Sequence, residues 1–254
     1  DAALDFDPDA KAKHNEVKFQ LSFKFKLWRD IIRDHTIKNI IEKSTGIRGV
    51  DLWVAYTQQS FWQLYNDAFS APFRDTNYEP ELLLNFRMQR EIPYLLGTKL
   101  QFVNIGFNHQ SNGRSEPLSR SWNRIVANVG LEKNFGTATN DSFELLLKTW
   151  YRLPEDDADD DNPDLSRYMG YGELWGTLYW KKQRFALMLR NNLRSDNKGA
   201  VQLEWSIPLA SINENLAPKI SLYVQYFNGY GESLLDYNKN VNRISAGLML
   251  ADWY

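Results

Sequence analysis

The chain has no cysteine among its 254 residues and only three histidines. Without thiols it has neither a disulfide framework nor a thiolate zinc site. Its formal net charge is −2, and no basic stripe is visible that would neutralise phosphates, which argues against nucleic acid as the main partner. No run approaches the roughly 20 apolar residues of a membrane helix, and the mean hydropathy is −0.53. Low hydropathy is still compatible with a transmembrane barrel, because its lumen-facing residues alternate with lipid-facing ones.

The strongest pattern in the chain is an alternation of apolar and polar residues at the two-residue period of a strand. It is clean from Glu16 to Leu27, where lysines recur opposite an aromatic and aliphatic face. Lysines inside a soluble sandwich would be buried at high cost, whereas in a polar lumen they would find carboxylate partners. Trp and Tyr gather at the strand ends, as in aromatic girdles. The chain is therefore predicted to be all-β, a transmembrane antiparallel β-barrel.

Eleven strands are predicted, over residues 16–27, 49–62, 78–91, 98–111, 119–135, 141–153, 166–180, 183–193, 200–208, 218–228 and 240–253. Residues 29–48 suit a short helix, in which His35 is a packed or solvated side chain. Residues 1–15 are predicted to be a polar segment, and residues 16–254 one barrel domain. Bacterial barrels have an even number of strands, so twelve are expected. We expect the missing strand upstream of Asp1 in a processed or trimmed chain, unless residues 1–15 supply it.

A histidine and a serine end one of these apolar strand faces. Val103, Ile105, Phe107, His109 and Ser111 share one face, and a hairpin centred on Glu116 places Asn123 opposite His109. Ser111 would attack a carbonyl carbon, His109 would take its proton, and Asn123 would hold the other imidazole nitrogen. A nucleophile on a lipid-facing surface suggests a lipid substrate. The alternative is that a His-x-Ser spacing has arisen by chance.

Several long motifs, in order, are similar to those of the outer-membrane phospholipase A family of Gram-negative bacteria. They are residues 108–115, Pro117 and residues 119–124 around the hairpin, then residues 72–80, 162–164, 168–171, 229–233 and 236–238. The resemblance runs from about Glu16 to Tyr254. It implies a twelve-stranded barrel in the cell outer membrane. If the last strand ends in the periplasm, counting the strands up and down places the loop after residue 111, and with it the active site, towards the outer leaflet.

The resemblance also implies calcium and a homodimer. At the matching positions, the Arg114 carbonyl and the Ser119 hydroxyl would bind Ca²⁺, and Ser70 of the partner subunit would complete the site. Gln58 would lie in the dimer interface, where a glutamine pair would satisfy its amide. The alternative for Gln58 is an amide at the lipid headgroup level. Gly113, two residues past Ser111, can present a backbone N–H to an oxyanion, and it is also an ordinary turn glycine.

An acidic run from Glu155 to Asp161 has two interpretations. Most such runs are solvated loops. In the resembled family a second calcium site uses acidic residues near this loop and near Glu116, which makes Asp161 and Glu116 candidates.

The sequence therefore predicts a calcium-dependent outer-membrane phospholipase that hydrolyses acyl ester bonds of phospholipids. The activity would be of A1/A2 and lysophospholipase type, with a Ser-His-Asn triad activated by homodimerisation. One rival is a non-enzymatic outer-membrane barrel, a channel or an adhesin, in which the His/Ser pair is incidental. Another is a barrel protease, which would cleave peptides without calcium.

Overall fold

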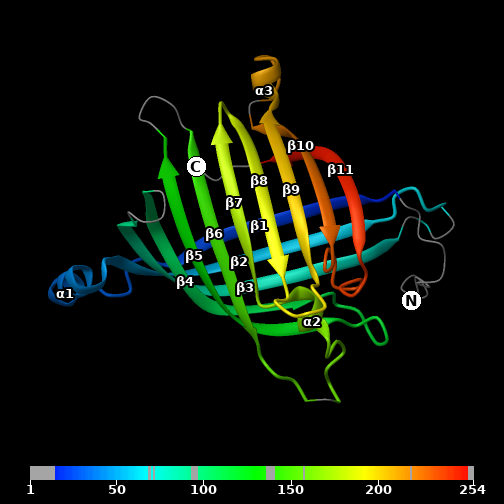
Figure 1. Cartoon of the computed structure of the whole chain (residues 1–254), viewed down its shortest axis with the longest axis horizontal. Coiled ribbons are helices and arrows are strands. Elements are labelled where there is room, and N and C mark those ends of the chain that lie inside the picture. The colour runs from blue at the N-terminus through cyan, green and yellow to red at the C-terminus, as the bar shows by residue number, and fades with distance from the viewer. Residues whose placement is uncertain are drawn as a thin grey trace.

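Eleven antiparallel strands form one continuous sheet in which every strand is hydrogen-bonded to its neighbours in sequence. This computed structural model describes residues 15–67, 70, 72–92, 97–135, 141–156, 158–217 and 219–250. The strands are β1 (Val17–Trp28), β2 (Ile47–Trp62), β3 (Phe73–Ile92), β4 (Thr98–Ser111), β5 (Ser121–Asn134), β6 (Ser142–Arg152), β7 (Gly172–Trp180), β8 (Gln183–Asn191), β9 (Gly199–Pro208), β10 (Ile220–Gly229) and β11 (Val241–Leu250). Figure 1 shows them side by side in chain order.

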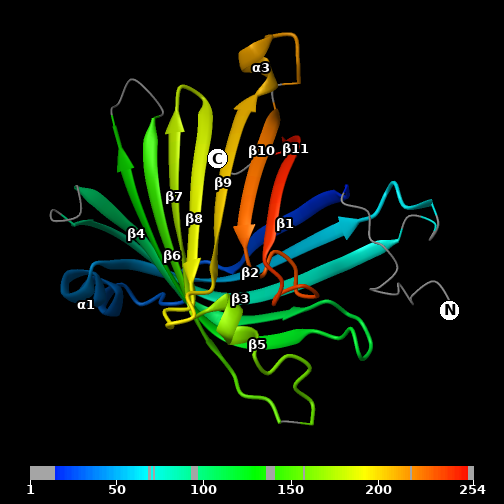
Figure 2. The ribbon, with the colours of Figure 1, turned by 45° about the vertical axis from the view of Figure 1, so that its right-hand side comes forward.

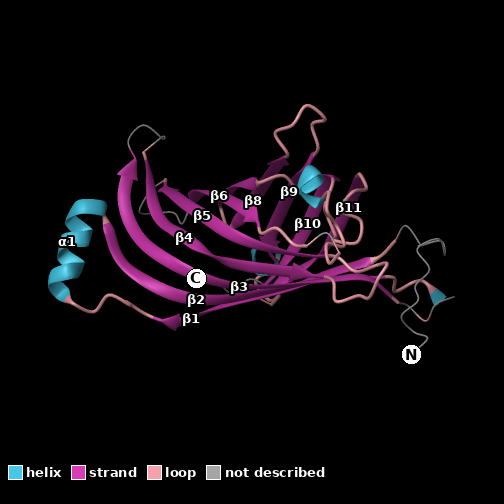
Figure 3. Ribbon diagram, turned by 90° about the horizontal axis from the view of Figure 1, so that it is seen from below, coloured by secondary structure: helices cyan, strands magenta, loops and turns pink. Residues whose placement is uncertain are grey.

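The sheet curls into a barrel wall, as the turned view in Figure 2 and the view from below in Figure 3 show. Within the described residues no ladder joins β1 to β11, but side chains link these edges at one end. Arg243 of β11 reaches Glu16, just before β1, at 2.7 Å. The eleven predicted strands are confirmed, and the predicted segment 1–15 lies almost wholly outside the described residues.

Three helices lie in the connections between strands: α1 (His35–Thr45), α2 (Leu165–Met169) and α3 (Leu209–Ile212). The predicted helix within residues 29–48 is confirmed as α1. Asp34 caps its first turn by accepting from the backbone N–H groups of Thr36 and Ile37, and Gly46 ends it with a φ of 80°. In the part of the chain that the structure describes, no helix has the length and apolar character needed to cross a membrane.

Two predicted strand boundaries were wrong. Strand β3 begins at Phe73, five residues before the predicted start, because residues 73–77 continue to pair with the end of β2. The segment predicted as a strand from residue 166 begins with α2 instead, and β7 starts at Gly172. Buried Leu165 and Met169, four residues apart, fall on one face of this short helix, a period that strand alternation misses.

The two faces of the wall differ as the alternation predicts. Large apolar side chains stay exposed on the outer face, including Leu21, Leu82, Leu84, Ile105, Phe107, Ile125, Leu147, Leu189, Leu203 and Leu248. Polar side chains line an interior space of about 2140 Å³. An outer apolar belt around a polar lumen is the arrangement of outer-membrane barrels.

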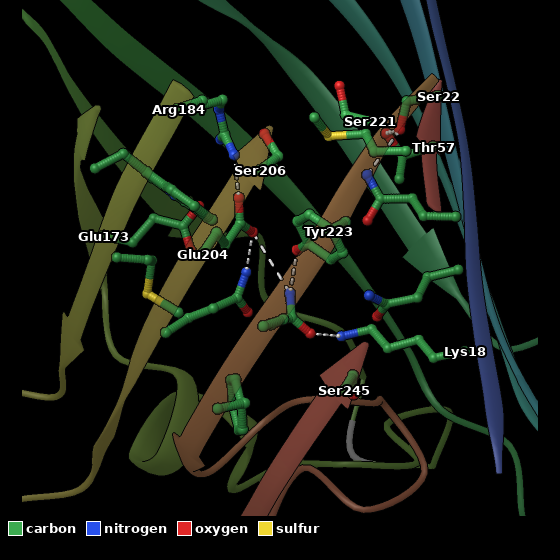
Figure 4. Close-up of a pocket in the computed structure, with 18 of the residues that line it drawn as sticks. Lys18, Ser22, Thr57, Glu173, Arg184, Glu204, Ser206, Ser221, Tyr223 and Ser245 are labelled. Carbon is green, nitrogen blue, oxygen red and sulfur yellow. Dashed lines mark hydrogen bonds and ion pairs between the residues drawn. The ribbon is translucent and has the colours of Figure 1, made fainter. Parts of the chain in front are cut away.

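Interior charges are paired with charges on neighbouring strands and loops. Lys18 binds Glu232 at 3.2 Å and Lys26 binds Asp51 at 2.8 Å, which confirms the carboxylate partners predicted for the β1 lysines. Figure 4 shows the same pattern further along the wall, where Arg184 donates to Glu204 at 2.6 Å. Paired interior charges avoid the cost of an unpaired buried ion and hold neighbouring strands together.

An apolar cluster fills one end of the lumen behind the β4–β5 hairpin. It combines wall residues with α2 and the loop after β10: Leu83, Trp122, Val126, Trp150, Leu165, Met169, Leu234 and Tyr237. Trp122 is fully buried at its centre, with its ring edge-on to Trp150 at 6.0 Å. Burial of Trp122 inside forces its neighbour Asn123 to the outer face.

Truncation of Trp122 should therefore unfold the barrel more easily. We expect Trp122→Ala to lower the free energy of unfolding in detergent by about 3–5 kcal/mol, because it leaves a cavity and deprives Arg124 of its stacking partner. Tyr151→Ala, which removes an outer aromatic that is 61% exposed, serves as the control and should cost under about 1 kcal/mol. Equal losses in urea unfolding would contradict this account of the core.

Candidate active site

The β4–β5 hairpin brings His109 and Asn123 together in the predicted register. The two residues are direct cross-strand partners, as are Phe107 with Ile125 and Ile105 with Ala127. The His109 Nδ1 and Asn123 Oδ1 atoms are 2.9 Å apart. Because the amide oxygen only accepts, the proton lies on Nδ1, which leaves Nε2 free to act as a base.

Inward-facing neighbours hold this pair in place. Gln110 accepts a hydrogen bond from the Trp122 indole N–H at 2.8 Å, and Arg124 binds Glu79 at 2.7 Å while it stacks 3.9 Å from the Trp122 ring. Arg124 also donates to Asn108. These inner residues alternate with His109 and Asn123, so the packed lumen side fixes where the outer pair points.

Ser111 lies on the same outer face, two residues beyond His109. Tyr78 on β3 and Ser121 on β5 are its cross-strand partners, and Gln58 on β2 is the partner of Tyr78. Exposed Phe107 and Ile125, the next cross-strand pair after His109 and Asn123, lie on the same face. A hydroxyl, an imidazole and an amide thus share the rim of an apolar surface.

The loop after Ser111 is folded around one buried side chain. Asn112 donates to the Leu118 carbonyl at 2.8 Å and accepts from the Arg120 backbone N–H at 2.9 Å. Gly113 follows with a φ of 62°, and a Cβ there would lie 3.2 Å from the Tyr78 ring. This left-handed position close to the Tyr78 ring favours glycine, which has no Cβ to strain the backbone.

The predicted calcium ligands are oxygen atoms in or near this loop. The Arg114 guanidinium donates to the carbonyls of Phe73 at 2.6 Å and Arg74 at 3.0 Å, which ties the loop to the segment that follows Ser70. Ser119 is half-buried and Ser70 is exposed. Among the described residues no three His, Cys, Asp or Glu side chains converge, so the candidate donors are mainly neutral oxygens.

The acidic run is partly tied down rather than freely solvated. Asp160 pairs with Arg152 at 2.6 Å, and Glu155 accepts a hydrogen bond from Asn123 Nδ2 at 2.9 Å. Asp161 is half-buried and Glu116 is exposed. A second metal site at Asp161 and Glu116 stays a prediction.

Sequence reasoning missed the contact of Glu155 with Asn123. The two residues are 32 positions apart, and Glu155 follows the strand in a loop where alternation no longer predicts direction. The only local signal is that β6 pairs with β5 and brings residue 153 beside Asn123. The Leu153 N–H donates to the Asn123 carbonyl at 2.8 Å.

The environment predicted for Gln58 needs correction. An unsatisfied amide was expected, but Gln58 accepts from the Tyr56 hydroxyl at 3.1 Å and donates to Ser60 at 3.4 Å along its own strand. Residues two apart on a strand share a face, so polar neighbours at 56 and 60 satisfy the amide without a partner subunit. Its role in a dimer interface is not tested by this contact.

Outside the strands, one ionisable group behind the site is strongly perturbed. Burial raises the pKa of the Tyr237 hydroxyl, and the hydrogen bond it donates to Asp164 raises it further. Tyr237 therefore stays protonated and keeps the loop after β10 tied to the segment before α2.

Comparison with known protein families covers nearly the whole chain, including the β4–β5 hairpin. The family model for phospholipase A1 matches residues 2–250. Phospholipase A1 of Klebsiella pneumoniae is 37% identical over 254 residues, which is all of this chain and 77% of that protein. Phospholipase A1 of Escherichia coli K12 is also 37% identical, over all of this chain and 76% of that protein.

Comparison with solved structures gives the same family. Outer membrane phospholipase A from Escherichia coli superposes with a TM-score of 0.78 at 37% identity, over 96% of this chain and 87% of that one. The outer membrane phospholipase of Salmonella typhi, solved as a dimer with bound calcium, gives a TM-score of 0.78 at 36% identity, over 95% and 80% of the two chains. The predicted barrel fold is confirmed by these likenesses.

Proposed function

The chain belongs to the phospholipase A1 family, and from that premise we propose that it is a calcium-dependent serine hydrolase with Ser111 as its nucleophile. Its relatives are outer-membrane phospholipases, and the apolar outer belt of this barrel suits the same membrane. The observation that carries the proposal is the 2.9 Å contact between His109 Nδ1 and Asn123 Oδ1, on the face that also bears Ser111.

The first half of the reaction is acyl transfer to the enzyme. The Ser111 hydroxyl oxygen attacks the ester carbonyl carbon, and its proton passes to His109 Nε2. The tetrahedral intermediate collapses as the bond to the glycerol oxygen breaks. His109 returns the proton to that oxygen, which leaves as the alcohol of a lysophospholipid, and the acyl group stays on Ser111.

The second half releases the fatty acid. Water attacks the acyl-Ser111 carbonyl and gives a proton to His109, and Ser111 leaves with that proton restored. Asn123 accepts from the Nδ1 proton throughout, so Nε2 stays aimed at the reacting oxygen. The negative oxygen that forms in both halves requires donors already in place, and we assign the Gly113 backbone N–H to this role.

Calcium fits the oxygen donors around this loop. The Arg114 carbonyl and Ser119 hydroxyl would hold it, with Ser70 of the partner subunit, and hard neutral oxygens are ligands that Ca²⁺ accepts. When bound, the ion supplies positive charge for the developing oxyanion. Because three converging acidic side chains are lacking among the described residues, such a site binds weakly without its partner's ligand.

A homodimer that forms around Gln58 would lie beside the nucleophile. Gln58 and Ser111 are both cross-strand neighbours of Tyr78, with only β3 between them. At the usual strand spacing they are about 10 Å apart. Leu21, the β1 partner of Gln58, is 57% exposed, so an apolar seam is available next to the reacting groups.

The site would face the outer leaflet. It lies at the strand ends that carry the connection after β6. The opposite end carries the two-residue turn between β7 and β8, together with the longer connections that contain α1 and α3. Outer-membrane barrels place short turns in the periplasm and longer loops outside. An outer-leaflet site meets phospholipid only when lipid asymmetry is lost.

The substrate class is tested with the refolded chain and mixed micelles of detergent and a phospholipid with different acyl chains at its two positions. A phospholipase of A1/A2 and lysophospholipase type should release both fatty acids in the presence of calcium. Peptide cleavage in place of fatty-acid release would favour a protease, and neither product would favour a channel or an adhesin.

A further inference from the structure

We propose that Glu155 is a positioning residue of the triad, which acts on His109 through the Asn123 side chain. This inference rests on the proposed function. The Glu155 carboxylate accepts from Asn123 Nδ2 at 2.9 Å, and Asn123 Oδ1 meets His109 Nδ1 at the same distance. Imidazole, amide and carboxylate thus form one continuous hydrogen-bonded chain from β4 through β5 to the loop after β6.

The first effect of Glu155 is to choose the orientation of the amide. An asparagine side chain presents an acceptor on one edge and donors on the other, and a carboxylate can only accept. With Glu155 on one side, the donor edge of Asn123 turns to the carboxylate and the acceptor edge turns to the imidazole. The flipped amide would point N–H groups at His109 and favour the wrong tautomer.

The second effect is electrostatic. Asn123 is neutral, so by itself it offers no charge to the imidazolium that forms when Ser111 loses its proton. A carboxylate on the far side of the amide polarises that amide and raises the negative charge on Oδ1, because hydrogen bonds in a chain strengthen one another. The Asn123–Glu155 pair thereby supplies part of the charge that an aspartate would supply directly.

Glu155 is held in place independently of Asn123. Its second oxygen faces Arg152 at 3.7 Å, and Arg152 in turn binds Asp160 at 2.6 Å and the Asn162 carbonyl at 2.9 Å. Leu153, two residues before Glu155, donates to the Asn123 carbonyl. Side chain and backbone together dock the loop after β6 against the site, and both carboxylate oxygens of Glu155 are engaged.

Three substitutions at Glu155 separate orientation from charge. Glu155→Gln keeps an acceptor and removes the charge, Glu155→Ala removes both, and Glu155→Asp keeps both on a shorter stem. We expect kcat for fatty-acid release to fall about tenfold in Glu155→Gln and further in Glu155→Ala, with KM within about twofold and partial recovery in Glu155→Asp. Asp156→Asn, the same charge change at an exposed neighbour, is the matched control and should keep wild-type kcat.

The pH profile separates this role from a purely structural one. Loss of the anion disfavours the protonated imidazole, and the unprotonated form is the active base. The acid limb of kcat in Glu155→Gln should therefore move to lower pH by about half a unit, while Asp156→Asn leaves it in place. Arg152, the charged group that faces Glu155, and Asp160, which pairs with Arg152, are unchanged in both variants.

A double-mutant cycle with Asn123→Ala completes the test. If Glu155 acts through Asn123, Glu155→Gln should have no further effect on kcat in the Asn123→Ala background. Equal effects of Glu155→Gln on kcat in the wild-type and Asn123→Ala backgrounds would overturn the inference. So would a Glu155→Gln variant that matches Asp156→Asn in kcat and pH profile. In either case, hydrolysis that still depends on Ser111 would leave the proposed function standing. Hydrolysis that survives Ser111→Ala would overturn both.

Discussion

Replacement of Ser111 by Ala should reduce calcium-dependent fatty-acid release by at least about a thousandfold. The methyl group cannot form the acyl-enzyme, so the two-step route through His109 is closed. The barrel itself should be unaffected, because Ser111 is half-buried at a strand end and its neighbours Tyr78 and Ser121 remain paired. KM and calcium binding should stay close to those of the wild type.

Ser115→Ala is the matched control for that experiment. Ser115 is an exposed serine in the same loop, and its backbone carbonyl accepts a hydrogen bond from the Leu118 N–H at 3.0 Å. It should retain release within about threefold of the wild type. If Ser115→Ala and Ser111→Ala lost activity equally, the loop fold rather than the nucleophile would be responsible.

Removal of calcium is the second change with a large expected effect. Excess chelator should lower fatty-acid release by about a hundredfold or more and shift the protein from dimer to monomer in sedimentation, because ligands from two subunits share the ion. Calcium should restore both properties. Magnesium should not, since it demands a regular octahedron and gives up its waters reluctantly.

Gln58→Ala tests whether calcium binding depends on dimerisation. This variant should need more calcium to dimerise and to reach half-maximal release, because a partner amide is lost from the seam. The effect should be modest, since the amide already has partners at Tyr56 and Ser60 in one chain. Full activity of the wild type in excess chelator, with no change in sedimentation, would contradict the calcium role.

The strands of the barrel and the pairing of His109 with Asn123 could be predicted, because both depend on the two-residue period of a strand. A hairpin centred on Glu116 predicts the partners of the residues between Phe102 and Gly130, and the observed pairing follows that register there. Beyond an irregularity between Leu100 and Phe102 the partners shift by one residue, so that Leu100 pairs with Leu131. One face must meet lipid and the other the lumen, so a slip of one residue would reverse both faces. Register is therefore strongly determined by the pattern alone.

The predictions that failed lie where that period ends. Residues 165–169 form a short helix whose buried residues are four positions apart. Residues 73–77 extend β3 because they pair with the end of β2, and the alternation of apolar and polar residues does not show where that pairing begins. Glu155 was read only as part of an acidic run. Its partner Asn123 comes from a distant strand, and nothing in the spacing of either residue indicates that contact.

That the lumen charges would be paired could be predicted from the sequence, but the residues that pair could not. Alternating lysines on β1 indicate carboxylate partners, but the two partners differ in origin. Lys26 binds Asp51 on the neighbouring strand, whereas Lys18 binds Glu232, 214 residues away. A partner on an adjacent strand follows from register, whereas one across the lumen depends on how far the sheet curls.

The most direct test of the central claim is covalent labelling of the refolded wild-type chain with a long-chain alkyl fluorophosphonate, followed by mass spectrometry of its peptides. The activated serine displaces fluoride and keeps the phosphonyl group. The account predicts one adduct, on Ser111, formed only with calcium present and in step with loss of fatty-acid release. An adduct on another residue with the same loss of activity would show that a different nucleophile performs the reaction and would contradict the account.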